Sequence, residues 1–263
     1  MRCSAPFNKE LVEMSTTQRQ SFNRFELKYW IDSDKQHQLQ QYISNFMKQD
    51  ANSRENDGYR ICSLYFDNRD RSAYYEKFDG NFIRNKYRIR FYNENTAKAF
   101  FEIKTKQNFF VRKNRQIMEF EPDEIPELKS ILSSEDDTVH GPFRFAYRQL
   151  KLEPIVWVSY HRTAFVGNHN PKLRVTFDRN LGGVDADGYR FRLGESQAVQ
   201  LSKWNNPIIL EIKFDGHLPY WLEKAIQDLN LQHQSISKYG LCVNRFIFRN
   251  WKERQWTHYQ SRA

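Results

Sequence analysis

Apolar and polar residues alternate along much of the chain, and this pattern predicts a protein built mainly from β-strands. In residues 83–92, Tyr87, Ile89 and Phe91 alternate with charged side chains, as in a strand with one buried face. Other segments share this alternation or a composition rich in strand-forming residues. The eight predicted strands are 23–31, 59–67, 83–92, 98–106, 111–121, 154–166, 172–180 and 207–214.

Apolar residues spaced three and four apart predict helices between the strands and at the end of the chain. Residues 33–48 carry an apolar stripe that includes Leu39 and Met47, with Ser33 as the expected cap. The other predicted helices are 70–78, 126–133, 142–151, 219–230 and 237–249.

The polar positions of the predicted strands are unusually rich in charge. Three strands repeat the same spacing of a glutamate and a lysine, as Glu26/Lys28, Glu102/Lys104 and Glu211/Lys213. Since side chains in a strand alternate between two faces, each such pair lies on one side of its strand. A single strand of this kind usually turns its charges to water. The repetition on many strands favours a charged interior instead.

Eight strands are also about the number that closes a small barrel with a fillable interior. We therefore predict an α+β protein, a closed eight-stranded antiparallel β-barrel with helices packed outside it. An interior lined with so many cations would repel itself unless a polyanion or a metal normally occupied it. Lys and Arg suit phosphate oxygens, and a few carboxylates suit a hard divalent cation that bridges those oxygens.

Composition adds a bias in charge. Lys and Arg number 41 against 32 Asp and Glu, and the formal net charge of +9 favours polyanionic partners such as phosphates, nucleic acid or anionic lipid. No apolar run approaches the ~20 residues that span a bilayer. The start of the chain has no signal-like stretch, and the three cysteines form no disulfide or zinc pattern. We therefore expect a cytoplasmic protein, with peripheral attachment to the inner face of a membrane as an extension of that expectation.

The domain organisation is predicted to be simple. The sequence shows no internal repeat and no composition shift that would mark a linker. We expect one domain over residues 21–250, between a flexible N-terminal segment, 1–20, and a C-terminal tail, 251–263.

A series of short motifs follows the predicted strands and the start of the last helix. The segments are Arg24–Trp30, Ser63–Asn68, Lys86–Tyr92, Phe101–Lys104, Tyr160–Phe165, Arg174–Asp178, Leu210–Lys213 and Ser237–Gly240. This set resembles the catalytic domain of the vacuolar transporter chaperone (VTC), a polyphosphate polymerase of the triphosphate tunnel metalloenzyme superfamily. Each motif alone is weak, but they occur in the family's order over about residues 22–249.

This resemblance implies transfer of the terminal phosphoryl group of ATP to a growing polyphosphate chain held in a basic tunnel. It implies Mn²⁺ or Mg²⁺ as cofactor, with Glu211 as the metal ligand and Glu26, Glu102 and Asp178 as further candidates. The implied phosphate-binding residues, with the neighbouring cations on the same strand faces, are Lys28, Lys86, Arg88, Arg90, Lys104, Lys113, Arg115, Arg162, Arg174, Lys213 and Lys238.

The resemblance also bears on partners, and at one position the sequence departs from it. ATP and polyphosphate are the expected partners, any coupling to a membrane would need a separate membrane-protein partner, and no nucleic acid is expected. The family pattern has a second lysine three residues before Lys238, where this chain has Ser235.

Two other functions stay open on the sequence. The first is a triphosphatase on the same tunnel fold, which would cleave inorganic or organic triphosphates. A first strand with the motif Glu-x-Glu-x-Lys would favour this function, whereas this chain has Arg24-x-Glu26-x-Lys28. A non-catalytic protein that binds polyanions or nucleic acid would fit the net charge. Such proteins usually concentrate their charge on one outer patch or helix, whereas here it is spread over many strands. The chain has no Gly-rich phosphate loop.

Overall fold

The computed structural model describes residues 24–54, 58–93, 95–107, 110–120, 128–133, 141–190, 195, 197–199 and 206–248. The predicted end segments, 1–20 and 251–263, lie outside these residues, as do the outermost parts of some predicted strands and helices.

All eight predicted strands are present, and two of them, 59–67 and 83–92, have the predicted bounds. The strands of the main path are β1 (Arg24–Ile31), β3 (Tyr59–Asp67), β4 (Ile83–Tyr92), β5 (Asn95–Gln107), β6 (Phe110–Glu119), β7 (Glu153–Gly167), β8 (Arg174–Asp185) and β10 (Ile208–Asp215). Two short strands that the sequence pattern did not predict, β2 (Met47–Gln49) and β9 (Gln197–Ala198), pair with β7 and β8.

The predicted helices are also present, although the first is shorter than expected. It ends at Ile43, and Met47 enters β2 instead, because the chain turns at 44–46 and its backbone then pairs with β7. Asp32, not Ser33, caps it by accepting a hydrogen bond from the Lys35 amide. The helices are α1 (Ser33–Ile43), α2 (Ala51–Arg54), α3 (Ser72–Phe78), α4 (Leu128–Ser133), α5 (Gly141–Gln149), α6 (Tyr220–Asp228), α7 (Lys238–Cys242) and the π-helical segment η1 (Val243–Phe248).

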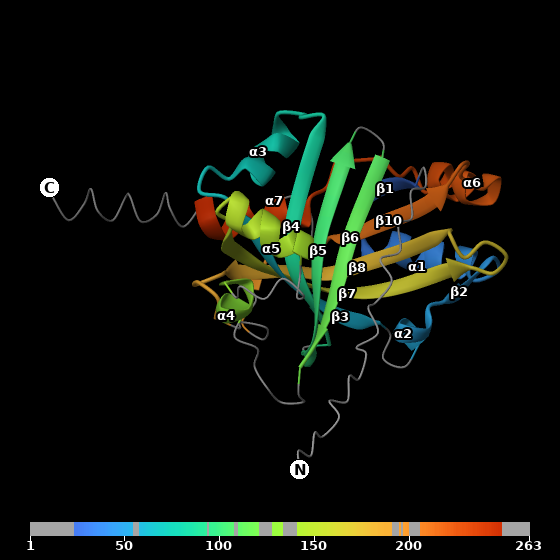
Figure 1. Ribbon diagram of the computed structural model, residues 1–263. Helices are drawn as coiled ribbons and strands as arrows, with labels where there is room; N and C mark the ends of the chain where they lie inside the picture. The colour runs from blue at the N-terminus through green and yellow to red at the C-terminus, as the bar shows by residue number, and fades with distance from the viewer. Residues whose placement is uncertain are drawn as a thin grey trace, which may run out of the picture.

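The main strands form one antiparallel sheet in the order β1-β10-β8-β7-β3-β4-β5-β6. The sheet is strongly coiled, and β4, β5 and β6 cross the direction of β7, β8 and β10 steeply in Figure 1. Closure into a barrel is not confirmed, since the hydrogen-bonded path begins at β1 and ends at β6 in the described residues. A mixed α and β protein around a large antiparallel sheet is what the structure establishes.

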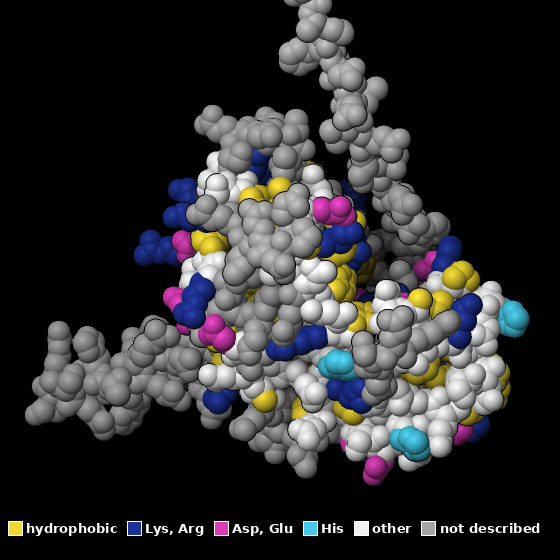
Figure 2. All heavy atoms as spheres, turned by 90° about the horizontal axis from the view of Figure 1, so that it is seen from below, with side chains coloured by type: hydrophobic (Ala, Val, Ile, Leu, Met, Phe, Trp, Pro, Cys, Tyr) yellow, Lys and Arg dark blue, Asp and Glu magenta, His cyan; other side chains and the backbone are white. Residues whose placement is uncertain are grey.

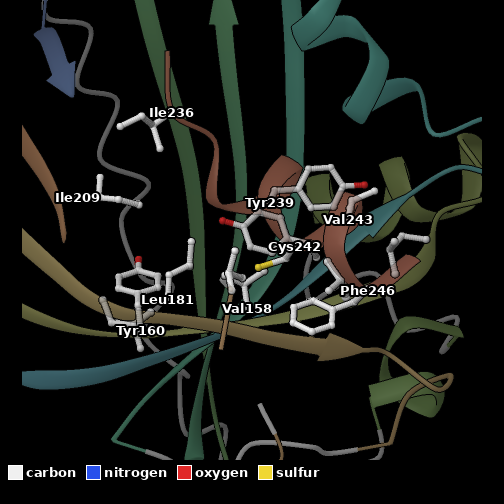
Figure 3. Packing of buried hydrophobic residues seen from close by; sticks show 14 of the residues in the cluster. Val158, Tyr160, Leu181, Ile209, Ile236, Tyr239, Cys242, Val243 and Phe246 are labelled. Carbon is white, nitrogen blue, oxygen red and sulfur yellow. The ribbon is translucent and has the colours of Figure 1, made fainter. Parts of the chain in front are cut away.

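Three apolar clusters fix the two faces of the sheet. One lies between α1, α6 and the strands β1, β8 and β10, and a second lies between α4, α5 and the strands β4 and β5. The third packs α7 and η1 against the opposite face of β3, β7 and β8 (Figure 3). In Figure 3, Tyr239, Cys242 and Phe246 from the helical segment lie against Val158 of β7. We call this opposite face the inner face.

Candidate functional site

The inner face carries the charged alternate positions that the sequence pattern singled out. On β1 and β10 the two Glu-x-Lys pairs meet in antiparallel register, so that Glu26 is opposite Lys213 and Lys28 is opposite Glu211. Their intervening neighbours Leu27 and Ile212 belong to the apolar cluster under α1 and α6. The alternation therefore turns the charges inward, against the ordinary expectation for a single charged strand.

A buried group of four charged side chains, which we call the Glu211 cluster, occupies the inner face of β7, β8 and β10. Arg162 holds both oxygens of Asp178 with its Nε and Nη2, at 2.6 Å each, and its Nη2 also lies 3.2 Å from Glu211 Oε2. Lys238, the first residue of α7, places its Nζ 2.6 Å from both Asp178 Oδ2 and Glu211 Oε1. All four side chains are buried. Ser237 caps α7 and so directs Lys238 inward.

Two further lysines and a carboxylate extend this cluster toward β5. Lys28 Nζ lies 3.1 Å from Glu26 Oε1 and 3.3 Å from Glu211 Oε1, and Lys213 Nζ lies 3.2 Å from Glu211 Oε2. Glu26 also accepts a hydrogen bond of 2.8 Å from Lys104. Since Glu26 is on β1 and Lys104 is on β5, next to β6, this contact joins the two ends of the sheet through side chains.

A second group, the Glu102 cluster, lies on the inner face of β4, β5 and β6. Glu102 is fully buried, and three cations converge on it. Arg88 Nε lies 2.7 Å from one carboxylate oxygen, whereas Arg115 Nε at 2.7 Å and Lys113 Nζ at 2.5 Å share the other. The side chains of Lys113 and Arg115 are each 37% exposed. One carboxylate therefore faces three cations, some of which reach solvent.

Three other predicted phosphate-binding residues lie on the inner face with polar partners outside these clusters. Arg90 donates to Ser63 and to the hydroxyl of Tyr160. Lys86 donates to Ser237, at 2.9 Å. Arg174 donates to Tyr59 and pairs with Asp50 at 2.9 Å.

Sequence reasoning missed several polar partners of the cations. They are Asp50, Tyr59, Ser63, Tyr65, Tyr160 and Ser237. The strand alternation held a signal for some of them, because Ser63 and Tyr65 share one face of β3 and Tyr160 lies two residues before Arg162 on β7. The segment with Ser235 runs beside β1, where the Gln234 amide donates to the Lys28 carbonyl.

Cations in the two clusters respond differently to burial. Burial lowers the pKa of Lys113 to about 6, and Arg88 and Arg115 add to this effect, which the attraction of Glu102 does not overcome. Burial also acts to lower the pKa of Lys238, but Asp178 and Glu211 raise it above its ordinary value.

The pKa values of the lysines between the clusters also depend on the carboxylates that contact each lysine. Burial would lower the pKa of Lys28, yet Glu211 and Glu26 raise it, because the ammonium group lies between the two carboxylates. Lys213 contacts Glu211, and burial lowers the pKa of Lys213 to about 8 against the attraction of Glu211 and Glu26. The surrounding cations hold the pKa of Glu211 well below its usual range, against the effect of burial. The carboxylate is therefore ionised at neutral pH.

The carboxylates provide hard oxygen donors but no ready-made metal cage. In the described ranges, no group of three or more His, Cys, Asp or Glu side chains is arranged to hold a metal ion. Glu211 and Glu26 approach a common point, since both contact the ammonium group of Lys28. This donor set fits Mg²⁺ or Mn²⁺ in the way that Mg²⁺ is commonly held, by one or two carboxylates together with phosphate oxygens.

A comparison with protein families identifies the class of protein. The VTC domain model matches residues 23–247, which is most of the chain and includes both clusters. The chain belongs to the VTC domain family. No curated protein sequence matches it significantly.

Two solved structures show distant similarity to the chain. A putative adenylate cyclase from Vibrio parahaemolyticus is 11% identical with a TM-score of 0.45, over 84% of this chain and 98% of that one. A protein from Pyrococcus horikoshii OT3 is 12% identical with a TM-score of 0.42, over 84% of this chain and 99% of that one. Similarity at this level carries no information on the chemistry of the site.

On the face drawn in Figure 2, the described residues form no single basic patch. Lys and Arg side chains are dispersed there among acidic, histidine and apolar ones. The concentration of cations that the sequence pattern indicated is on the inner face instead. No helix in the described part of the chain is long and apolar enough to cross a membrane.

Proposed function

We propose that this protein is a metal-dependent polyphosphate polymerase, which transfers the terminal phosphoryl group of ATP to a polyphosphate chain. The observation that carries the proposal is the inner face, on which cations from opposite parts of one sheet converge around buried carboxylates. Membership of the VTC domain family supports the same reading. ATP and polyphosphate would be the partners within the site.

The two clusters suit different parts of a phosphoryl transfer. The Glu102 cluster has more cations than one carboxylate neutralises, so Arg88, Lys113 and Arg115 would bind phosphate oxygens and hold the chain in line. In the Glu211 cluster the cations and carboxylates are closer to balance, which would fix their positions before substrate arrives.

Glu211, with Glu26 beside it, would hold Mg²⁺ or Mn²⁺ in the proposed enzyme. The metal would supply neutralisation of charge on the phosphate oxygens. The chain's own cations act by position. Arg162 and Lys238, each bound to two carboxylates, are fixed donors beside the phosphates, and fixed charges of this kind are a large term in catalysis.

Phosphoryl transfer asks little covalent chemistry of a protein. Positioning of the ATP phosphates and of the polyphosphate end, with neutralisation of their charge, can supply the catalysis. The inner face offers the groups for both. Hydrolysis of a triphosphate would use the same groups with water in place of the polyphosphate end. A triphosphatase is therefore the second candidate, and it differs in the acceptor.

The test is an assay of purified full-length protein with ATP and Mg²⁺ or Mn²⁺. We expect polyphosphate to accumulate with release of ADP, and chelation of the metal to stop it. Release of inorganic phosphate from triphosphate without any polymer would favour the triphosphatase. Failure to bind either ATP or inorganic triphosphate would overturn both.

The remaining alternative is a non-catalytic protein that binds nucleic acid. A phosphate chain can enter a narrow interior that is far too small for a duplex. Short polyphosphate should therefore compete with ATP, whereas duplex DNA should leave turnover unchanged. Arg88→Ala with Arg90→Ala should weaken polyphosphate binding much more than any binding of DNA. The opposite result would contradict an inner-face site.

A further inference from the structure

One buried hydroxyl on the inner face has no hydrogen-bond partner in the described part of the chain. Thr176 of β8 is fully buried, and its Oγ1 finds no hydrogen-bond partner among the described residues. Leaving a buried hydroxyl without a hydrogen bond destabilises the folded protein, because the group loses its hydrogen bonds to water and gains none in return. An unpaired hydroxyl beside a candidate site therefore suggests that a bound ligand supplies the missing hydrogen-bond acceptor.

The position of Thr176 places this hydroxyl next to Glu211. Thr176 is directly opposite Glu211 in the antiparallel pairing of β8 with β10, and residues so placed have Cβ atoms about 5 Å apart. It shares the inner face with Asp178, two residues further on, whereas Val175 and Phe177 point into the apolar cluster under α1 and α6.

The neighbours of Thr176 do not satisfy it. Ala164, which is opposite it on β7, has no polar side-chain atom. The oxygens of Glu211 are already bound, Oε1 by Lys238 and Lys28 and Oε2 by Arg162 and Lys213.

We propose that Thr176 donates a hydrogen bond to a phosphate oxygen bound beside Glu211, and so is a further ligand-binding residue of the site. This inference rests on the proposed function. An acceptor at this place would lie among Arg162, Lys213 and Lys238, which favours an anion. A hydroxyl adds a directed donor there without adding charge, and it remains a donor over the whole accessible pH range.

The substitution Thr176→Val tests the inference, because valine has nearly the same shape and no hydroxyl. Binding of inorganic triphosphate is measured by calorimetry with and without Mg²⁺, and melting curves are recorded without ligand. We expect the affinity to fall about tenfold, the size of a hydrogen bond to a charged group. The melting temperature without ligand should not fall, since the hydroxyl lost was unpaired. Thr176→Ser should bind within about threefold of the wild type.

Thr163→Val is the matched control. Thr163 is also buried, but it lies on the other face of β7, opposite Phe177, and accepts a hydrogen bond from Arg179. Its variant should lose stability and keep its affinity for triphosphate. If Thr176→Val does not fold, Thr176→Ala, which only truncates the side chain, is measured in its place.

The outcomes separate this inference from the proposed function. Unchanged triphosphate affinity in Thr176→Val, with normal binding by the wild type, would overturn the role of Thr176 alone. If the wild type itself does not bind triphosphate, the proposed function fails. Equal losses of affinity in Thr176→Val and Thr163→Val would mean that the effect is structural, and would also overturn the inference.

Discussion

The Glu102 and Glu211 clusters use the same residue types in opposite balance. In the Glu102 cluster a single carboxylate meets Arg88, Lys113 and Arg115. In the Glu211 cluster, Arg162 and Lys238 each bridge Glu211 and Asp178. The Glu102 cluster therefore has more cations than carboxylates, whereas the Glu211 cluster holds each of these two cations between two carboxylates.

The lysine pKa values follow this difference rather than burial alone. Lys238 is nearly inaccessible, yet its pKa is raised because two carboxylates contact it. Lys113 is more exposed, yet burial of its ammonium group lowers its pKa to about 6, and Arg88 and Arg115 add to this effect against the single carboxylate of Glu102. We infer that the Glu211 cluster is preorganised, and that the Glu102 cluster gains most when a polyanion arrives.

The largest effect is expected at Glu211. Glu211→Gln keeps the shape of the side chain but removes the charge that faces Lys28, Lys238 and the proposed metal. We expect metal-dependent turnover to fall by about 100-fold or more. Full turnover of this variant at saturating Mn²⁺ would show that Glu211 is not part of the site.

Glu119→Gln is the control for that substitution. Glu119 is an exposed residue of β6, four residues along the strand from Arg115, that pairs with Lys98 at 2.6 Å. Its variant should keep the turnover of the wild type, since surface pairs contribute little.

The next effect concerns stability and should appear in the Glu211 cluster. Asp178→Asn leaves Arg162 without its two-oxygen partner in a buried place. Breaking a buried pair in this way typically costs about 3–5 kcal/mol in the free energy of unfolding. Chemical denaturation measures it. Asp228→Asn, which breaks an exposed pair with Lys224 on α6, should leave the free energy of unfolding nearly unchanged.

Acid should act on the same cluster. Against the effect of burial, the pKa of Asp178 is lowered in the folded protein by Arg162 and Lys238, and that of Glu211 is lowered most by Lys238, Lys28 and Lys213. Their contribution to stability is therefore present above about pH 4 and is lost as the pH falls below that value. Asp178→Asn should weaken this loss, and an unaltered acid transition would contradict the assignment.

The strand pattern predicted the charged inner face, but not how the charges pair. Period two is a local property, so bounds such as 83–92 could be predicted from the sequence alone. The position of Lys28 between Glu26 and Glu211 depends on the pairing of β1 with β10, segments that are far apart in sequence. Alternation alone does not reveal which strands are neighbours.

Helical and loop contributions to the site were harder to predict for the same reason. Lys238 was expected in the site only by family resemblance, because nothing in its local sequence shows that α7 packs on the inner face. The end of the helix predicted at 33–48 was wrong because pairing of Met47 with Gly167 of β7 overrides the apolar stripe. Tertiary pairing decided both.

A smaller effect should appear in the pH dependence of binding. Lys113 is mostly neutral above pH 6 without ligand, and a bound polyanion would favour its charged form, so binding takes up a proton. Affinity for triphosphate should therefore fall as the pH rises from 6 to 8, by at most about tenfold per unit for this proton. Lys113→Arg, whose side chain stays charged, should flatten the dependence. If the affinity of the wild type and that of Lys113→Arg fell equally with pH, the lowered pKa of Lys113 would be contradicted.

The smallest effect is in the ligand-free protein, and it tests the contrast between the clusters directly. At pH 7, Lys113 is largely neutral when folded but charged when unfolded, so the unfolded state binds more protons and the residue costs stability. Lys113→Met should raise the melting temperature by at most about 1–3 °C, because Glu102 keeps Arg88 and Arg115 and solvent screens the partly exposed Lys113. Triphosphate should then stabilise the variant less than the wild type. Lys238→Met should do the reverse and lower the melting temperature strongly, since it leaves two buried carboxylates short of a partner. Similar losses in both lysine variants would mean that the clusters do not differ as described.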